Sequence, residues 1–283
     1  MSDPAPPRRK RRPRVAEVVR TEQLTPHMLR VVLGGAGLEG FGTGEFTDHY
    51  VKLIFPPPGA PYGLPVDTEA VEAEHPRELW PVTRTYTVRW WDGERGELAI
   101  DVVHHGDSGI APPWAAAARP GDRIPLFGPG GAYAPADDAE WHLLVGDESA
   151  LPAIAATLEA LPAEAKAVAI VEVADAGEEQ PVVTAADVEL SWVHRDSATG
   201  EPGAAVLEAV RAATERGGDL FAFVHGEADM VRAVRRHLRL ERQVPLERLS
   251  VSGYWRLGRT DERWRAEKKD WNAAVEQEET AGS

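Results

Sequence analysis

The chain has 283 residues and a mass of 30.8 kDa, more than one average domain, so we expect two domains that each bury a core. Its formal net charge is -15, with 31 Lys and Arg against 46 Asp and Glu, and this excess disfavours binding to nucleic acids and to anionic membranes. The absence of cysteine excludes disulfides, thiolate metal sites, cysteine-held iron–sulfur clusters and a cysteine nucleophile, so any redox chemistry requires a bound organic cofactor or a metal.

Residues 1–14 are rich in proline and carry six Arg or Lys against one Asp. Such a run is typical of an arm that binds nucleic acid or an anionic surface, and also of a solvated, disordered tail. We favour the tail. No stretch approaches the roughly 20 apolar residues that span a bilayer. The expectation is a cytoplasmic protein with neither a membrane nor a nucleic-acid partner.

Short strands punctuated by Gly and Pro are predicted from residue 15 to residue 127. Their ranges are 15–19, 28–33, 50–55, 82–91, 97–104 and 122–127. Residues 56–81 interrupt the pattern with seven prolines and many carboxylates, and we interpret them as a surface excursion without an element of its own. Strands at this spacing predict a small antiparallel β-barrel over residues 15–134.

After residue 140 the pattern changes to strands and helices in alternation. Strands at 141–145, 167–173, 220–224 and 249–252 alternate with helices at 151–161, 204–216 and 229–240. This alternation is typical of a parallel sheet with crossover helices, in which ligands bind beyond the carboxyl ends of the strands. The predicted fold is therefore β + α/β, with an α/β domain over residues 140–258 and a charged helix and tail over residues 259–283.

The stretch RTYTVR, residues 84–89, combines strand-forming residues with an unusual number of polar groups. Alternation along a strand places Arg84 and Tyr86 on one face and Thr85 and Thr87 on the other. The arginine can offer a cation to a phosphate, the tyrosine a ring to a flat aromatic ligand, and a threonine a hydroxyl to its edge. The alternative is an exposed amphipathic strand with an ordinary ion pair.

A second stretch, DVVHHGDSGIAPPWA over residues 101–115, runs from a strand through a Gly-bearing turn into a helix that starts with proline. Free backbone N–H groups at such a helix N-terminus favour a pyrophosphate, although a plain capped helix has the same pattern. The adjacent His104 and His105 point to opposite faces of a strand, which argues against a metal site. We expect a structural or cofactor-contacting role for one of them.

Together these stretches resemble the siderophore-interacting protein family of FAD-dependent ferric-siderophore reductases, whose fold is ferredoxin-reductase-like. The resemblance covers about residues 15–260, and the combination is much more specific than any single motif. It includes RTYTVR, the stretch at 101–115, RPGD at 119–122, GPGG at 128–131, LVGDESALPAI at 144–154 and GYWRLG at 253–258. One departure is GIAP at 109–112, where the family has GPAS, so a hydroxyl is lost and the diphosphate must depend on backbone donors.

The resemblance implies that the first domain holds FAD. Arg84, Tyr86 and Thr87 would contact the flavin and its phosphate side, residues 101–103 would line the isoalloxazine, and His105 would lie beside the cofactor. The cofactor-binding residues implied in full are Arg84, Thr85, Tyr86, Thr87, Asp101, Val102, Val103, His105, Gly109, Ile110, Ala111, Pro112 and Trp114.

The resemblance also implies a pyridine-nucleotide site on the second domain. Its nicotinamide-side loop consists of Gly146, Asp147, Glu148, Ser149 and Ala150. The simpler alternative for this loop is a helix start capped by Asp147 or Ser149. His194 and Arg195 follow another predicted strand and are candidates for the phosphates, with a surface basic pair as the alternative. The donor stays open between NADH, NADPH and reduced ferredoxin.

Many ferric siderophores are anionic, so a negatively charged protein needs local cations to attract them. Lys52 is a lone cation in the apolar strand YVKLIF and matches a basic position of the family, although it is also typical of a snorkelling edge lysine. Arg256 is a second candidate, and Tyr254 and Trp255 beside it contact either the substrate, the flavin or the barrel. Gly130 stands where some relatives carry a basic residue, which weakens the expectation of a strongly anionic substrate.

The prediction is a cytoplasmic FAD enzyme that takes electrons from NADH or NADPH and passes them singly to siderophore-bound Fe(III), releasing Fe(II). A nicotinamide delivers two electrons together and Fe(III) accepts one, and a flavin can link the two. No side-chain acid or base is expected to be essential. One alternative is a flavin reductase whose acceptor is a protein or a small organic oxidant. Another is a siderophore-binding protein in which FAD is structural or absent.

Overall fold

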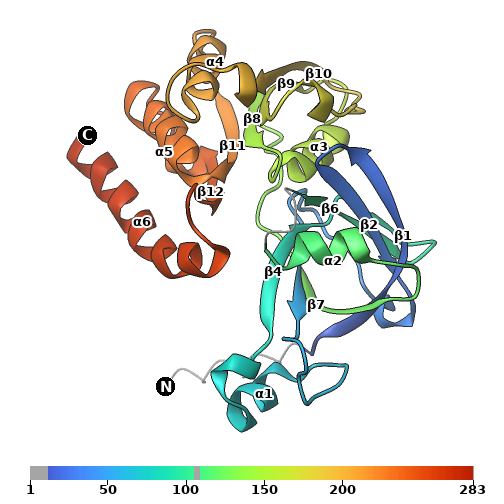
Figure 1. The fold of residues 1–283 in the computed structure, drawn as a ribbon. Helices are drawn as coiled ribbons and strands as arrows, with labels where there is room; N and C mark the ends of the chain where they lie inside the picture. The colour runs from blue at the N-terminus through green and yellow to red at the C-terminus, as the bar shows by residue number, and fades with distance from the viewer. Residues whose placement is uncertain (1–11, 105–108, 283) are drawn as a thin grey trace, which may run out of the picture.

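The structure, a computed structural model, describes residues 12–104 and 109–282 and contains two sheets that follow one another in the chain (Figure 1). Seven antiparallel strands form the first sheet: β1 (Arg14–Thr25), β2 (Met28–Gly34), β3 (Tyr50–Phe55), β4 (Val82–Thr87), β5 (Trp90–Asp92), β6 (Glu97–Val103) and β7 (Arg123–Gly130). The second sheet is parallel, so the predicted β + α/β fold class is confirmed. Most of the basic N-terminal tail lies outside the described residues.

The first sheet curls because its two edges are joined by a bend in the chain. The strand order is β4-β3-β7-β1-β2-β6-β5, so the edge strands β4 and β5 are neighbours in sequence. At the bend between them, the Val88 N–H donates to the His49 carbonyl at 2.6 Å and the Arg89 N–H donates to the Ala99 carbonyl at 2.8 Å. The single strand predicted over 82–91 is therefore divided, because its first half pairs with β3 and its second half with β6.

One face of this sheet forms the core of the first domain. Alternate residues of β2, β3 and β6 have no exposed surface, as in Val31 and Leu33, Val51 and Leu53, and Leu98, Ile100 and Val102. Each such side chain contributes about 1.5–3 kcal/mol on burial. The intervening residues Val32, Ile54 and Ala99 are buried as well, so β2, β3 and β6 are covered on both faces.

Residues 56–81 contain an element that the sequence analysis did not predict. Helix α1 (Thr68–Glu74) begins after Asp67, whose carboxylate accepts from the Ala70 N–H at 3.1 Å. Val66 and Val71 are buried against Ile54, on the outward face of β3. The expectation of an excursion without an element was wrong because this short helix covers an apolar side chain that would otherwise face water.

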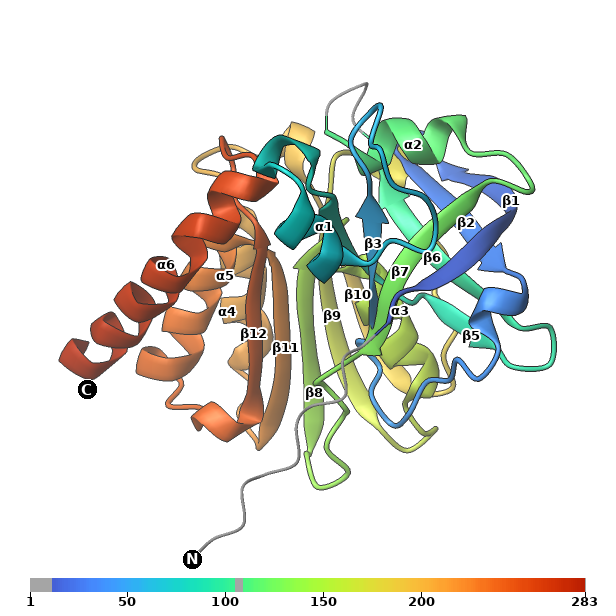
Figure 2. The ribbon, with the colours of Figure 1, turned by 90° about the horizontal axis from the view of Figure 1, so that it is seen from below.

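The second sheet has the order β10-β9-β8-β11-β12 and helices on both faces. Its strands are β8 (Trp141–Asp147), β9 (Lys166–Val173), β10 (Asp187–His194), β11 (Leu220–Glu227) and β12 (Leu249–Trp255). The helices are α3 (Leu151–Ala160), α4 (Ala204–Thr214) and α5 (Ala228–Arg236), which a π-helical turn (His237–Glu241) extends. Figure 2 shows α4 and α5 on one face and α3 on the face toward the first domain.

The chain ends in a 22-residue helix, α6 (Asp261–Gly282), that packs on the second domain beside β12. Trp264, Trp271 and Val275 are buried in the same cluster as α4, α5 and β11. The Trp264 Nε1 donates to the Gly253 carbonyl at 3.3 Å, and Glu278 and Glu279 form ion pairs with Arg232 and Arg235 of α5. In the described part of the chain, no helix combines the length and apolarity needed to cross a bilayer.

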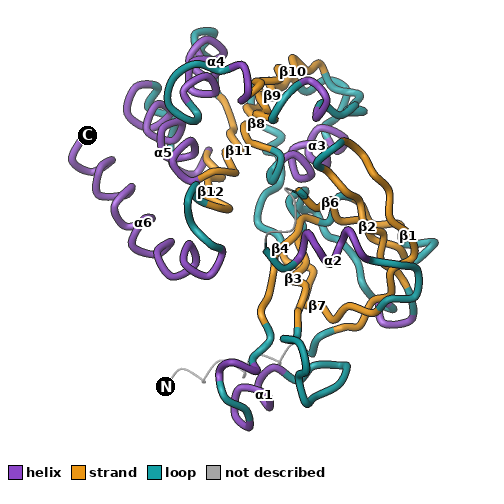
Figure 3. Tube along the Cα trace, in the orientation of Figure 1, coloured by secondary structure: helices purple, strands orange, loops and turns teal. Residues whose placement is uncertain are grey.

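Polar contacts join the two domains on the side of α3. Arg89, at the bend after β4, donates to both carboxylate oxygens of Glu159 at 2.7 and 2.5 Å. The buried carboxylate of Glu178, after β9, accepts from the Thr25 hydroxyl at 2.5 Å and from the His27 N–H at 3.1 Å. These contacts hold the amino-terminal sheet against α3 and leave β4 facing β12 and α6 (Figure 3).

Candidate functional site

Strand β4 carries the implied flavin-binding side chains on two faces. Arg84 and Tyr86 lie opposite Leu53 and Val51, on the core face, and Thr85 lies opposite Lys52, on the outer face. Tyr86 packs against the core of the first domain, and burial raises its pKa. The strand therefore presents one cation and one ring on one face and a hydroxyl on the other, as alternation predicts.

Arg84 is held by carboxylates from the far end of the chain. Its Nη1 lies 3.1 Å from Asp261 Oδ2 and its Nη2 donates to Glu262 Oε1 at 2.5 Å, in the first turn of α6. Arg265, one turn further, donates to the Thr83 hydroxyl at 3.0 Å and to the Thr83 carbonyl at 2.8 Å. The sequence analysis missed these partners, since a charged helix start does not reveal which arginine it meets.

The side chains at the end of β6 make their contacts within the first domain. The buried carboxylate of Asp101 accepts from Arg30 Nε and Nη2 at 2.7 and 2.8 Å. Val102 is fully buried in the core, and Val103, at the end of the strand, is half-buried. His105 lies outside the described residues. Among the described residues of this implied set, Val103 is the side chain that is not fully buried.

The turn before α2 (Ala111–Ala117) offers fewer backbone donors than an ordinary helix start. Pro112 and Pro113 have no N–H, and the N-cap residue Ile110 makes no side-chain capping bond. Gly109 has φ +85°, a left-handed conformation that suits glycine. The N–H groups of residues 109–111 are what this turn can direct at a diphosphate.

Trp114 places α2 at the same end of the first sheet as Arg84. Its ring packs edge-on against Phe55, with centroids 5.6 Å apart, and Phe55 lies opposite Val82, two residues before Arg84. A cation, a tyrosine ring and backbone N–H groups are thus available at this end of the domain. A cation, an aromatic ring and backbone donors are the groups that suit the diphosphate and the ring system of a flavin dinucleotide.

In the second domain, the turn after β8 is closely packed. A Cβ on Gly146 would lie 2.6 Å from the Ala150 Cβ and 2.8 Å from the His225 carbonyl, so only glycine fits there. The fully buried carboxylate of Asp147 accepts from the Ser149 N–H at 2.8 Å and hydroxyl at 2.5 Å, and from the Glu227 N–H at 2.7 Å. Burial raises the pKa of Asp147.

The capping role considered for Asp147 and Ser149 was wrong. The N-cap of α3 is Ala150, and no side chain caps it. Asp147 instead joins three strand ends, because it also accepts from Trp255 Nε1 at 2.8 Å, at the end of β12. The carboxyl edge of the parallel sheet is therefore organised around this carboxylate.

Both basic candidates after β10 are paired with carboxylates. Arg195 Nη2 donates to Glu148 Oε2 at 2.6 Å and its Nε donates to Glu172 Oε2 at 3.1 Å. His194 Nε2 lies 2.7 Å from Glu179 Oε1. Arg195 thus reaches the turn at residues 146–150 through Glu148, and an anionic ligand of Arg195 would have to replace one of these carboxylates.

The residues implied for the substrate are divided between the domains. Tyr254 is bonded through its hydroxyl to His225 Nδ1 at 2.9 Å, and Arg256 forms an ion pair with Asp229 at 3.3 Å. Burial raises the pKa of Tyr254, and the negative charge of Asp48, just before β3, adds to this. Lys52 is exposed on β3, with its Nζ 5.9 Å from the centre of the Tyr50 ring.

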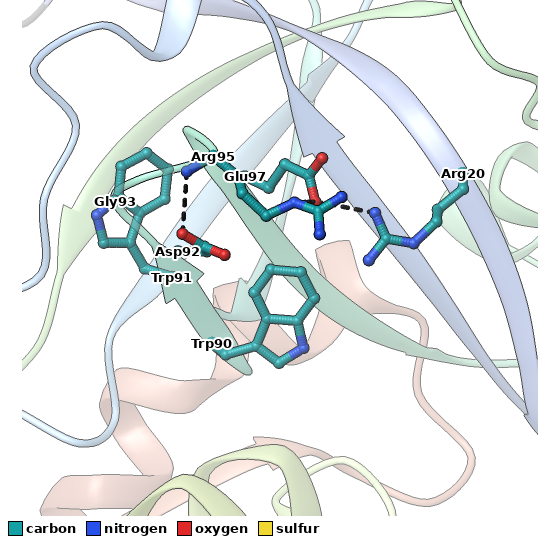
Figure 4. Close-up of a pocket in the computed structure, with 7 residues that line it drawn as sticks. All are labelled: Arg20, Trp90, Trp91, Asp92, Gly93, Arg95 and Glu97. Atoms are coloured by element: carbon teal, nitrogen blue, oxygen red, sulfur yellow. Dashed lines mark hydrogen bonds and ion pairs between the residues drawn. The ribbon is translucent and has the colours of Figure 1, made fainter.

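A separate hollow of about 580 Å³ lies beside β5 and contains none of the predicted site residues (Figure 4). Trp90 and Trp91 line it together with Arg20, Arg95 and Glu97. Both arginines are paired with Glu97, at 2.9 and 3.5 Å, and Arg20 is also paired with Glu22 at 2.9 Å, so two carboxylates balance the two positive charges. Within residues 12–104 and 109–282, no group of three His, Asp or Glu side chains is arranged as a metal site.

Comparison with known families gives two matches that together span most of the chain. Residues 17–133 match the siderophore-interacting FAD-binding domain, and residues 139–258 match the siderophore-interacting protein model.

Individual proteins agree with these matches. Ferric vibriobactin reductase ViuB of Vibrio cholerae is 32% identical over 261 residues, which cover 90% of this chain and 94% of that protein. The NADPH-dependent ferric-chelate reductase of Escherichia coli is 34% identical over 243 residues, with coverage of 84% and 91%. The crystal structure of a siderophore utilization protein from T. fusca has a TM-score of 0.75 and 37% identity, with coverage of 88% and 94%.

Proposed function

The chain belongs to the siderophore-interacting protein family, and we propose that it transfers electrons from NADPH or NADH through FAD to ferric siderophores in the cytoplasm. The match of residues 17–133 to an FAD-binding domain carries this proposal. The ferric reductases of V. cholerae and E. coli support the iron-bearing acceptor, and the NADPH dependence of the E. coli enzyme supports NADPH as donor.

In this proposal the first domain binds and orients the cofactor. Arg84 supplies the positive charge for the diphosphate, and the N–H groups of residues 109–111 donate to it. The Tyr86 ring packs against the isoalloxazine, and Thr87 lies at its edge. When bound, FAD would accept two electrons together and release them one at a time, which is the step that links a nicotinamide to Fe(III).

The second domain positions the nucleotide. Gly146 lets the turn at residues 146–150 pack closely against Ala150 and the His225 carbonyl, and Asp147 holds that turn against β11 and β12, so the turn is fixed in place for a nucleotide at the carboxyl ends of the strands. Arg195 would exchange Glu148 or Glu172 for a phosphate of the nucleotide. No acid or base is needed, since the residues act by binding and orientation.

The ferric siderophore would bind between β3 and the end of β12. Lys52 is an exposed cation on the face of β3 that carries Tyr50, and Arg256 is a second cation at the end of β12. Together they provide positive charge for an anionic chelate on a protein whose net charge is -15.

An anaerobic absorbance experiment tests the proposal. The FAD-loaded protein is mixed with NADPH or NADH, and a ferric siderophore and a ferrous trap are then added. The expected result is bleaching of the flavin band, its return on addition of the siderophore, and trapped Fe(II) in proportion. A flavin that is bleached but returns no electrons to the iron complex would indicate another acceptor. Protein that takes up no FAD would contradict the proposal.

A further inference from the structure

Helix α6 is anchored on one domain and reaches the other with its first turn. Trp264 and Trp271 are buried in the second domain, and Glu279 pairs with Arg235 of α5. The carboxylates of Asp261 and Glu262 contact Arg84 of β4, in the first domain. Figures 1 and 3 show this end of α6 directed toward β4. The helix therefore connects the domains on the side opposite α3.

The contact on Arg84 conflicts with the role that Arg84 has in the proposed function. Its side chain is 14% exposed, and both of its Nη atoms are already paired with α6 carboxylates. A diphosphate bound to Arg84 would place further negative charge beside the carboxylates of Asp261 and Glu262, and these like charges would repel one another. Arg84 can serve the cofactor fully only if these carboxylates move away.

The first turn of α6 can move without leaving an unpaired buried charge. Asp261 Oδ2 also forms an ion pair with Arg265 Nε, at 2.8 Å, so it keeps a partner on its own helix, and the Glu262 side chain is 57% exposed and can be solvated. Gly258 precedes the helix with φ +73° and no atom within 4 Å of a Cβ position, which leaves room for a hinge. Trp264 and Trp271 stay buried in the second domain, so the movement is confined to residues 261–263 at the start of the helix.

We propose that the first turn of α6 is a latch that occupies Arg84 in the FAD-free protein and is displaced when the FAD diphosphate binds. The inference rests on the proposed function, in which Arg84 holds the phosphate side of FAD. It adds that Asp261 and Glu262 set the affinity for the cofactor by competing for the same guanidinium. FAD loading is thereby coupled to the contact between α6 and the first domain.

Cofactor affinity of the full-length FAD-free protein tests the latch. The variant Asp261→Asn/Glu262→Gln should bind FAD about three- to tenfold more tightly, since two partly exposed ion pairs no longer compete. Its affinity for riboflavin, which has no phosphate, should stay that of the native protein. The control Asp270→Asn/Glu276→Gln removes the same charge from exposed positions on the same helix and should change neither affinity. Affinities are measured by titration of flavin fluorescence.

The substitutions are compatible with folding of α6. The helix start is capped by Thr260, whose hydroxyl accepts from the Arg263 N–H at 3.3 Å, and the tryptophan anchors are untouched. Hydrogen exchange on the native protein provides a second readout: adding FAD should increase exchange at residues 261–265 while it decreases exchange at residues 82–87. Unchanged or greater protection of the α6 start on FAD binding would overturn the latch.

The variant Arg84→Gln separates the latch from the proposed function. If FAD binds native protein, Arg84→Gln weakens it, and the α6 double variant leaves it unchanged or weaker, then the carboxylates orient Arg84 and the latch alone is wrong. If Arg84→Gln leaves FAD affinity unchanged, the phosphate role of Arg84 is wrong and the latch with it. If native protein binds no FAD, the proposed function itself fails.

Discussion

The two domains differ in where the polar side chains of their candidate sites find their partners. On the first domain, Thr85 and Lys52 are exposed, and Arg84 is held by carboxylates that belong to α6. On the second domain, Asp147 accepts four hydrogen bonds from its own domain, and Arg195 is held by two of that domain's carboxylates. A ligand on the first domain can bind by exchanging contacts between the domains, whereas a ligand on the second domain must exchange contacts within that domain.

The largest expected effect tests how tightly the second domain is packed. Gly146→Ala should lower the free energy of unfolding of this domain by about 3 kcal/mol, because the new methyl group overlaps the His225 carbonyl and the Ala150 side chain. Gly63→Ala, in the first domain, is the control, since no atom lies within 4 Å of its Cβ position. Urea unfolding measures both. Equal stability of the two variants would show that the turn at residues 146–150 is not rigid.

The next effect concerns a buried histidine of the second domain. Burial lowers the pKa of His225 to about 3, from an ordinary value of 6.5. As the pH falls below 6.5, His225 becomes protonated in the unfolded chain but stays neutral in the folded protein. The free energy of unfolding therefore decreases as the pH falls toward 3. Between pH 6.5 and 5 this should cost the native protein about 1–2 kcal/mol relative to His225→Gln. Parallel pH profiles of the two proteins would contradict the burial argument.

A smaller effect is expected from the removal of Arg195, an arginine of the second domain that is paired with two carboxylates. Arg195→Ala leaves Glu148 and Glu172 facing the nucleotide without a cation, and we expect about tenfold weaker NADPH binding with normal FAD content. The control Arg216→Ala removes an exposed arginine that pairs with Glu189 in the same domain. Affinity is measured by nucleotide titration of the FAD-loaded protein. Weaker binding in both variants would indicate a general charge effect instead of a site.

The smallest effect is expected on the open face of the first domain. Lys52→Ala should weaken ferric-siderophore binding about threefold, because an exposed cation in water contributes little, and it should leave the flavin spectrum unchanged. Lys166→Ala removes an exposed lysine at the start of β9 as the control. Quenching of protein fluorescence by the ferric complex provides the affinities. A Lys52 variant that binds like native protein would remove Lys52 from the site.

Local sequence patterns predicted the limits of the strands that lie inside the two sheets. The strand at residues 50–55 has the predicted limits, and β9 begins one residue before its predicted start. The bend at Val88 and Arg89 was missed because alternation continues through it, and only pairing with two different strands reveals it. Helix α1 was missed because its seven residues are held by contact with Ile54 of β3.

In the candidate site, the sequence predicted the site residues but not the residues that contact them. The implied site residues were named from motifs, but the motifs do not contain their partners. Arg30 is 71 residues from Asp101, and Glu262 is 178 residues from Arg84. A motif contains only residues that are near one another in the sequence, so it gives no information about partners that are distant in the sequence.

The sequence by itself determined the fold class, the change from a strand-rich first domain to an alternating second domain, and the residue types available for chemistry, because hydrophobic period and backbone preference are local properties. Only the tertiary structure decided which carboxylate meets Arg84, that Asp147 binds its neighbouring strands instead of capping α3, and that α6 connects the two domains. Ion pairs and buried hydrogen bonds depend on distances between residues far apart in the chain, and these distances exist only once the domains have packed.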